Sequence, residues 1–150
     1  MIDVNTGIFK IDNALEIRPG YTFDDFKRSA FYNGEDGVRI IYLGKHKVID
    51  GQKYIVSLFF RNNIIYMISL ILSEVDYSEK DEAKRKENHD EVLKKNGITS
   101  NTGYDWGKIS SEYDARSNIS SINICYNCIG YPAVSYSTPP PSLPCNSASP

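Results

Sequence analysis

The stretch Ile64-Ile65-Tyr66-Met67-Ile68-Ser69-Leu70-Ile71-Leu72 is apolar at nearly every position. A strand with one solvated face alternates between apolar and polar residues, whereas a strand buried on both faces does not. We therefore predict that Ile64–Leu72 is a central strand, with a helix or a partner covering its second face. At nine residues the run is too short for a membrane-spanning helix, which needs about 20.

Further strands are predicted on both sides of this run. They cover residues 7–12, 38–43 and 53–60 before it, and residues 104–114 and 119–126 after it. Asp50-Gly51 and Arg61-Asn62-Asn63 separate neighbouring apolar runs, and such residues favour tight turns. The strands around residues 38–72 are therefore expected to form an antiparallel meander.

Two helices are predicted from their capping residues. Thr22 suits the N-cap of a short helix that ends near residues 29–31, with Asp24 and Asp25 in its first turn. The second helix is predicted over residues 78–96, with Ser78 as the N-cap candidate and Asp81 three residues on. Twelve of its nineteen residues are charged. Its apolar residues lie mostly near its C-terminal end, so its first turns are expected to project into solvent. A solvated face accounts for its charges, and a charged docking surface is the alternative.

The element order is strand, helix, three strands, helix and two strands. This order predicts an α+β fold with a largely antiparallel sheet of about five or six strands. One short helix and one long, highly charged helix accompany the sheet.

Composition indicates one folded domain followed by a different segment. The chain has 150 residues, of which 41% are hydrophobic and 24% charged, as in globular domains. Every charged residue lies at or before Arg116, and six of the seven prolines lie between Pro132 and Pro150. We predict a single domain over residues 1–127 and an extended or disordered Pro/Ser-rich tail over 128–150. This tail is interpreted as a linker or extension, or alternatively as a ligand for an SH3-like groove.

Charge and the N-terminal sequence argue against several partners and locations. The formal net charge of −2 gives no basic footprint for nucleic acid. The first residues show neither the basic region nor the apolar region of a signal peptide. We therefore expect a cytoplasmic protein that binds neither nucleic acid nor a membrane.

No catalytic, metal-binding or cofactor-binding motif is evident. The two histidines, His46 and His89, lie in a basic turn and on the charged helix, and no G-x-S-x-G or phosphate-binding loop is present. Cys125 and Cys128 form a C-x-x-C, but only Cys145 remains to complete a zinc site, which needs four ligands. We predict no metal, no cofactor, idle thiols and no enzymatic activity.

One aromatic cluster is a candidate for partner binding. Tyr104, Asp105 and Trp106 follow a polar loop, and an aromatic residue beside a carboxylate is typical of an interface anchor. Asp114 and Arg116, in the next turn, are candidates for the same contact surface. The alternative is that Trp106 caps the core at the start of a strand.

The stretch from Trp106 to Ile122 carries a resemblance. It reads Trp-Gly-Lys-Ile-Ser-Ser-Glu-Tyr-Asp-Ala-Arg-Ser-Asn-Ile-Ser-Ser-Ile and is similar to the ends of small uncharacterised bacterial proteins. The whole plan also resembles small α+β immunity proteins of bacterial polymorphic-toxin systems. That resemblance implies a protein that neutralises a toxin by binding it. It assigns no contact residue, because immunity families share no universal residues.

Three functional hypotheses follow. The first is an immunity or antitoxin-like protein that occludes a partner toxin by steric and electrostatic means. The second is a small-molecule-binding or enzymatic domain, with a pocket between the sheet and the short helix lined by Tyr21, Phe26 and Phe31. The third is a structural subunit that oligomerises through Ile64–Leu72 or an open sheet edge. A monomer or a small homo-oligomer is expected.

Overall fold

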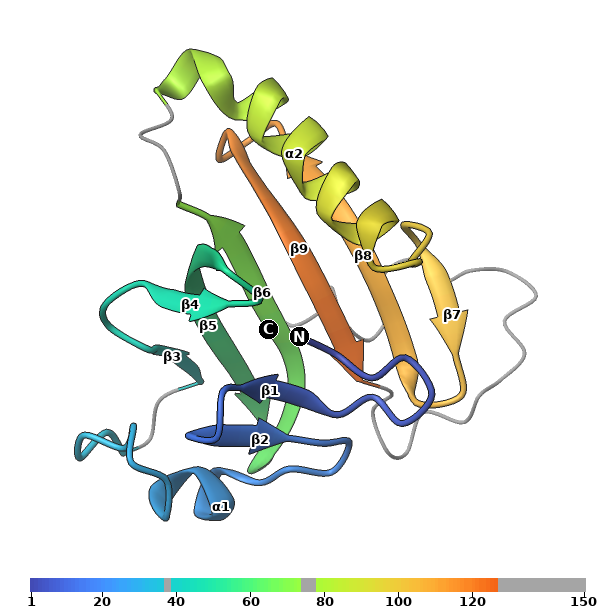
Figure 1. Cartoon of the computed structure of the whole chain (residues 1–150). Coiled ribbons are helices and arrows are strands. Elements are labelled where there is room, and N and C mark those ends of the chain that lie inside the picture. Colours follow the sequence, from blue (N-terminus) through green and yellow to red (C-terminus); the bar gives the residue numbers. More distant parts are fainter. Residues whose placement is uncertain (37–38, 74–77, 127–150) are drawn as a thin grey trace.

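The computed structural model describes residues 1–36, 39–73 and 78–126 (Figure 1). These residues form an α+β fold with two helices and two sheets in which every strand pair is antiparallel. The predicted fold class is confirmed at this level. The Pro/Ser-rich tail of residues 128–150 lies outside the described residues.

The main sheet has seven strands and the second sheet has two. The order of the main sheet is β3 (Ile40–Tyr42), β5 (Gln52–Arg61), β6 (Ile64–Leu72), β9 (Ile119–Tyr126), β8 (Gly107–Asp114) and β7 (Thr102–Tyr104), and β4 (Lys47–Ile49) also pairs with β5. The small sheet is the hairpin of β1 (Phe9–Ile11) and β2 (Leu15–Ile17). The helices are α1 (Phe23–Lys27) and α2 (Glu82–Lys95), which follows the 3-10 turn η1 (Glu79–Asp81).

The strand predicted over residues 7–12 is present as β1, but β2 and β4 were not predicted, so the described residues form more strands than the five or six expected. One strand prediction needs correction. The single strand predicted over residues 104–114 is divided, because Asp105 and Trp106 form the turn between β7 and β8. Asp105 favours a turn, but Trp106 does not, so this two-residue turn carries a weaker sequence signal than an Asp-Gly or Asn-Gly pair.

Strand β6 is central, as its apolar sequence predicted. It pairs with β5 along its whole length and with β9 on its other side. The β6–β9 pairing covers only four residue pairs, from Met67↔Cys125 to Leu70↔Ile122. Beyond Leu70 the two strands diverge, and Figure 1 shows the gap that opens between them.

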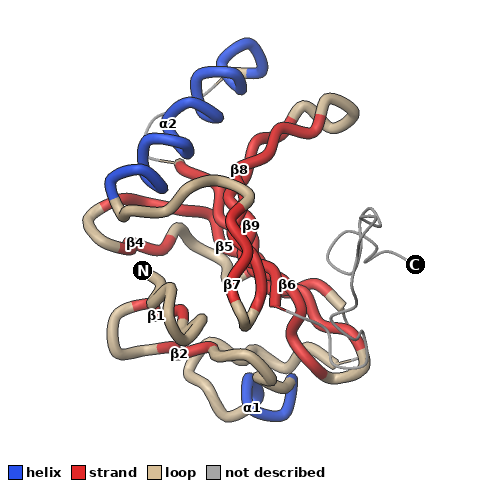
Figure 2. Tube along the Cα trace, turned by 90° about the vertical axis from the view of Figure 1, so that its right-hand side faces the viewer, coloured by secondary structure: helices blue, strands red, loops and turns tan. Residues whose placement is uncertain are grey.

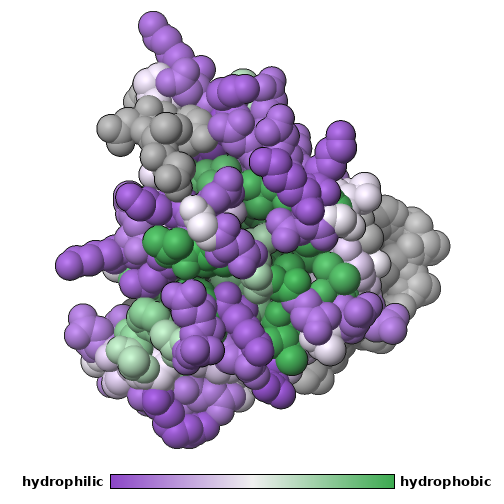
Figure 3. Space-filling model, viewed as in Figure 1, coloured by the Kyte–Doolittle hydropathy of each residue, from purple (hydrophilic) through white to green (hydrophobic). Residues whose placement is uncertain are grey.

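The two faces of the main sheet differ in what packs on them. Alternate residues such as Leu58, Ile68 and Ile124 are buried on the face that carries α2, the β1–β2 hairpin and α1. Figure 2 shows these elements on one side of the sheet. We call this the covered face. From this side, Figure 3 shows a mainly hydrophilic surface over α2, with apolar surface visible below the helix.

None of the described helices or strands packs on the opposite side of the main sheet, which we call the open face. Its residues alternate with those of the core along each strand. They include Ile55 and Phe59 on β5, Met67 and Ile71 on β6, and Asn123 on β9. The sequence predicted that a helix or partner covers the second face of β6, and neither of the described helices does so.

Helix α1 closes one end of the covered face with aromatic rings. Thr22 is the N-cap and forms a capping box with Asp25, which confirms the predicted helix start. Phe23 stacks on Phe60 at 5.5 Å between ring centroids, and Phe26 lies 6.3 Å from the same ring. Tyr21 is also buried against Phe60. Tyr21 and Phe26, which the sequence placed around a pocket, therefore belong to the packed core.

Helix α2 is attached to the sheet by polar contacts at the gap between β6 and β9. The backbone N–H of Leu72 donates to Nε2 of His89 at 3.0 Å, and that of Ser120 donates to Oε2 of Glu82 at 2.9 Å. Leu72 and Ser120 lie two residues beyond the last β6–β9 pair, Leu70↔Ile122. The helix thus supplies the acceptors that the diverging strands no longer give each other. The first turn of α2 was expected in solvent, but Glu82 is buried there because Ser120 and Arg85 satisfy its carboxylate.

Trp106 fixes the N-terminal segment against the other end of the sheet. Its Nε1–H donates to the carbonyl of Val4 at 2.8 Å, and the Tyr126 hydroxyl donates to the carbonyl of Gly7 at 2.8 Å. Gly7 has a φ of 78°, and a Cβ there would lie 2.6 Å from the indole ring. The chain can pass this close to Trp106 only because residue 7 has no side chain.

We expect Gly7→Ala to destabilise the fold more than Gly20→Ala. Gly20 also has a positive φ, of 87°, but has no atom within 4 Å of an added Cβ. Both variants carry the strain of a left-handed alanine, about 1–2 kcal/mol. Gly7→Ala adds an overpacking cost of about 1–3 kcal/mol against the indole. Urea unfolding followed by Trp106 fluorescence measures both variants, and equal losses would contradict the packing of Gly7 on Trp106.

Candidate functional site

The open face carries most of the exposed apolar side chains of the described residues. The described residues include five exposed large hydrophobic side chains, those of Ile40, Tyr42, Val48, Tyr113 and Ile119. The strand register places all of these except Tyr113 on the open face. Tyr42 is 67% exposed and Val48 50% exposed, so these side chains do not serve the core. An apolar surface gathered on one face is typical of an interaction site.

A groove of about 340 Å³ crosses this face where the β8–β9 hairpin meets β5 and β6. Phe59, Met67 and Ile119 give it an apolar floor. Glu112 and Asp114 supply carboxylates from β8. Its remaining lining residues, apart from Tyr113, are short and polar: Ser69, Ser117, Ser121 and Asn123. We call this the sheet-face groove.

Hydrogen bonds hold both carboxylates of the sheet-face groove in place. Glu112 accepts from the Ser110 hydroxyl at 3.0 Å and from the Asn123 amide at 3.2 Å. Asp114 accepts from the backbone N–H of Arg116 at 2.9 Å and from the Ser117 hydroxyl at 2.8 Å. These bonds lower the pKa of Asp114, so its carboxylate is charged at neutral pH.

The five residues predicted for partner binding fall into two separate places. Tyr104, Asp105 and Trp106 lie at one end of β8, and Asp114 and Arg116 lie at its other end. Strand β8 has eight residues, which separates the two groups by roughly 25 Å. The structure therefore does not bring them together in one site.

Each predicted residue has a distinct environment. Trp106 is buried and stacks on half-buried Tyr104 with ring centroids 5.2 Å apart, as expected of a residue that caps the core. Asp105 is exposed beside them. Asp114 lines the sheet-face groove, and Arg116 is exposed in the adjoining turn without lining it.

Sequence reasoning did not identify Phe59, Met67, Glu112 or Asn123 as site residues. The available signal was the doubly apolar sequence of β6, which implied that something covers both of its faces. Glu112 and Asn123 could be found only from the β8–β9 register. In that register Glu112 lies opposite Ser121, and Asn123 lies opposite Ser110.

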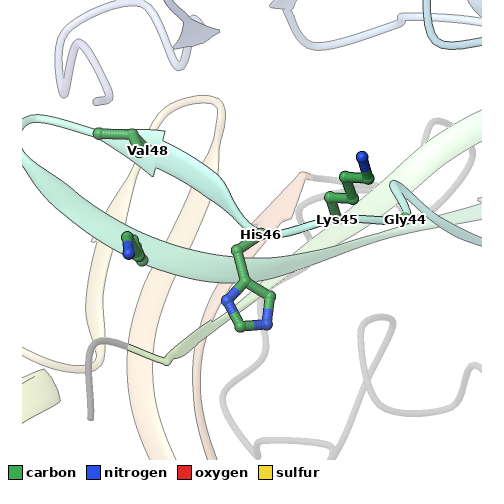
Figure 4. A pocket seen from close by; sticks show the side chains of 5 residues that line it. Gly44, Lys45, His46 and Val48 are labelled. Carbon is green, nitrogen blue, oxygen red and sulfur yellow. The ribbon is translucent and has the colours of Figure 1, made fainter.

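A second hollow lies at the opposite edge of the sheet, in the turn between β3 and β4. It is open and basic, with a volume of about 700 Å³, and is lined by Gly44, Lys45, His46, Val48 and Lys53. Figure 4 shows the side chains of Lys45 and His46 pointing in different directions, so they do not converge on a common point. His46 instead shares a hydrogen bond of 3.2 Å with Ser73. This arrangement does not form a defined ligand site.

The described residues show no arrangement for metal binding. They contain no group of three or more histidine, cysteine, aspartate or glutamate side chains that could hold a metal ion. Cys125 is buried, and Cys128 of the predicted C-x-x-C lies outside the described residues. Within the same part of the chain, no helix is both long enough and apolar enough to cross a bilayer.

Comparison with known proteins leaves the site to be interpreted from its own geometry. No protein-family model, no curated protein and no solved structure matches this chain.

The buried histidine has a structural role. Burial is the main cause that lowers the pKa of His89 to about 4, with the charge of Arg85 acting in the same direction and that of Asp90 opposing it. The imidazole is thus neutral at neutral pH, and its Nε2 accepts the Leu72 N–H. A neutral ring used as a fixed acceptor holds the helix on the sheet.

We expect this ring to make stability depend on pH. The unfolded chain takes up a proton near pH 6.5, whereas folded His89 does so only near pH 4. The contribution of neutral His89 to the free energy of unfolding is therefore complete above about pH 6.5 and is lost as the pH falls toward 4. Between about pH 7 and pH 4.5 this loss is about 2 kcal/mol.

Urea unfolding of the wild type and of His89→Gln at both pH values measures the effect. The glutamine variant keeps an acceptor near Leu72 but does not titrate. Its free energy of unfolding should fall less than that of the wild type over this range. An identical fall in both proteins would contradict the neutral, buried state of His89.

Proposed function

We propose that this chain is a non-catalytic binding protein that occludes a partner protein with the open face of its main sheet. The observation that carries the proposal is the one-sided fold, in which both helices and the β1–β2 hairpin lie on the covered face (Figure 2). The central strand β6 is left with apolar side chains on the other side. A partner that docks there would bury them.

The composition of the open face supports docking of a protein. Phe59, Met67 and Tyr42 belong to residue types enriched in protein interfaces. The polar residues around them are hydrogen-bonded within the sheet, as Glu112 and Asn123 show. The surface therefore loses little conformational entropy when a partner binds.

The resemblance to immunity proteins of polymorphic-toxin systems supports a toxin as the partner. Such a protein needs no chemistry of its own, because covering the active surface of the toxin is sufficient. A sheet is suited to this role, since its strands hold the contacting side chains in fixed positions. Carboxylates at one end of the open face add an electrostatic contribution to recognition.

Self-association is the second candidate function, and the same open face supports it. Two copies could pack their apolar faces together as a symmetric dimer. Sedimentation of the full chain at micromolar concentration distinguishes the two. A stable dimer would favour the structural-subunit hypothesis, and a monomer would favour a different partner.

A growth assay tests the toxin hypothesis. The tagged full chain is used to capture partners from its source cells, and each captured protein is expressed alone in a bacterial host. We expect one partner to stop growth and co-expression of the wild-type chain to restore it. If no captured protein stops growth, or if the wild-type chain fails to restore it, the toxin hypothesis is contradicted.

Two variants test whether the partner binds to the open face. Ile119→Glu changes a residue that is 43% exposed on this face, so the fold should tolerate it. Ala83→Glu introduces the same charged residue at an exposed position on α2 and serves as the control. We expect Ile119→Glu to weaken partner affinity at least about 30-fold, as for an interface hot spot, and Ala83→Glu to have no effect. Equal affinity of both variants would show that the partner binds elsewhere.

A further inference from the structure

We propose that the sheet-face groove is a subsite for one cationic side chain, an arginine or lysine, carried on an apolar segment of the partner protein. This inference rests on the proposed function and names the chemistry of the partner at one place on the open face. Glu112 and Asp114 would bind the cation, and Phe59, Met67 and Ile119 would contact the apolar part of the same segment.

The charge of the groove is the first argument. Its lining includes two carboxylates and no lysine, arginine or histidine. In the described part of the chain, no cationic side chain lies within salt-bridge distance of either carboxylate. Arg116 in the adjoining turn acts electrostatically on Asp114, but it is beyond salt-bridge distance and does not line the groove. The two acids therefore leave negative potential in the groove. A partner cation would be attracted by this negative potential, and a partner carboxylate would be repelled by it.

The fixed geometry of the carboxylates is the second argument. Glu112 and Asp114 point to the same side of β8, two residues apart. Neighbouring hydroxyl, amide and backbone groups donate to each of them. Each carboxylate can still accept further hydrogen bonds, because an ionised carboxylate has about four acceptor positions. The planar donors of a guanidinium suit two such acceptors, so arginine is the better match.

The apolar floor is the third argument. A groove that bound only a small ion would need no hydrophobic surface. Phe59, Met67 and Ile119 instead line the space next to the carboxylates. Arginine and lysine have long apolar stems that pack on such surfaces while their charged groups reach polar partners. The volume of about 340 Å³ exceeds that of an ion and is at the lower end of the range for ligand pockets.

A peptide titration of the isotopically labelled full chain tests the subsite without a partner. The probes are two blocked tripeptides, acetyl-Leu-Arg-Leu-amide and acetyl-Leu-Glu-Leu-amide. We expect the arginine peptide to shift the backbone amide signals of Ser69, Ser121 and Asn123, and the glutamate peptide to shift them at least about fivefold less. The inference is overturned if these signals do not move with the arginine peptide or move equally with both.

Isosteric variants assign the effect to the two carboxylates. Glu112→Gln with Asp114→Asn removes both charges and keeps the side-chain shapes. We expect the double variant to reduce the arginine-induced shifts at least about fivefold. Asp105→Asn, at the far end of β8, removes one acid outside the groove and should leave them unchanged. Equal reduction by Asp105→Asn would indicate a general charge effect and overturn the subsite.

The two proposals fail in different ways. A toxin neutralised equally well by the wild type and by the double variant would overturn the subsite and leave the proposed function standing. A chain that binds the arginine peptide in the groove but neutralises no captured protein would support the subsite and contradict the toxin hypothesis.

Discussion

Two hydrogen bonds at the gap between β6 and β9 hold the architecture in place. The strands share four residue pairs and then diverge, and the backbone N–H groups of Leu72 and Ser120 lie two residues beyond the last pair. Leaving a buried donor unsatisfied costs about 1–3 kcal/mol, so the divergence requires acceptors from elsewhere. Helix α2 provides both, through His89 and Glu82. The same divergence separates the tip of the β8–β9 hairpin from the β5–β6 hairpin. The sheet-face groove is lined by residues of both hairpins on the open face.

This arrangement explains how a helix with few apolar residues can pack on a sheet. Val92 and Leu93 are buried near the C-terminal end of α2, and the Glu82 carboxylate fixes its N-terminal end. Hydrophobic contact alone would allow the helix to slide or rotate, whereas directed hydrogen bonds to two strands set one position. Because α2 occupies the covered face, the apolar side chains of the open face have no counterpart among the described helices. The docking of α2 on one face and the exposure of Tyr42, Val48 and Ile119 on the other both follow from the placement of the described helices on a single face.

Local signals in the sequence predicted the elements better than the site. The capping boxes of Thr22 and Ser78 and the apolar run of β6 are contained in a few neighbouring residues, and the structure confirms the helix starts and the central strand. The buried roles of Glu82 and His89 could not be found in this way, because each depends on a backbone N–H from a distant strand. Trp106 shows the same limit. Its sequence context allows both an interface anchor and a cap on the core, and the contact with Val4 and Gly7, about 100 residues away, shows that it belongs to the core. The groove joins four strands, so its residues share no local pattern.

The position of β9 has a consequence during synthesis of the chain. This strand fills the middle of the sheet, between β6 and β8, yet it follows every other described strand in the sequence. Its last residue, Tyr126, is translated 54 residues after Leu72 (126 minus 72), which takes about 3–10 seconds at ordinary ribosome speeds. Throughout this interval the inner edge of β6 stays unpaired and its apolar residues are accessible to chaperones or to other nascent chains. A hairpin forms within microseconds, so closure of the sheet waits for the emergence of β9 from the ribosome and not for the pairing of β8 with β9.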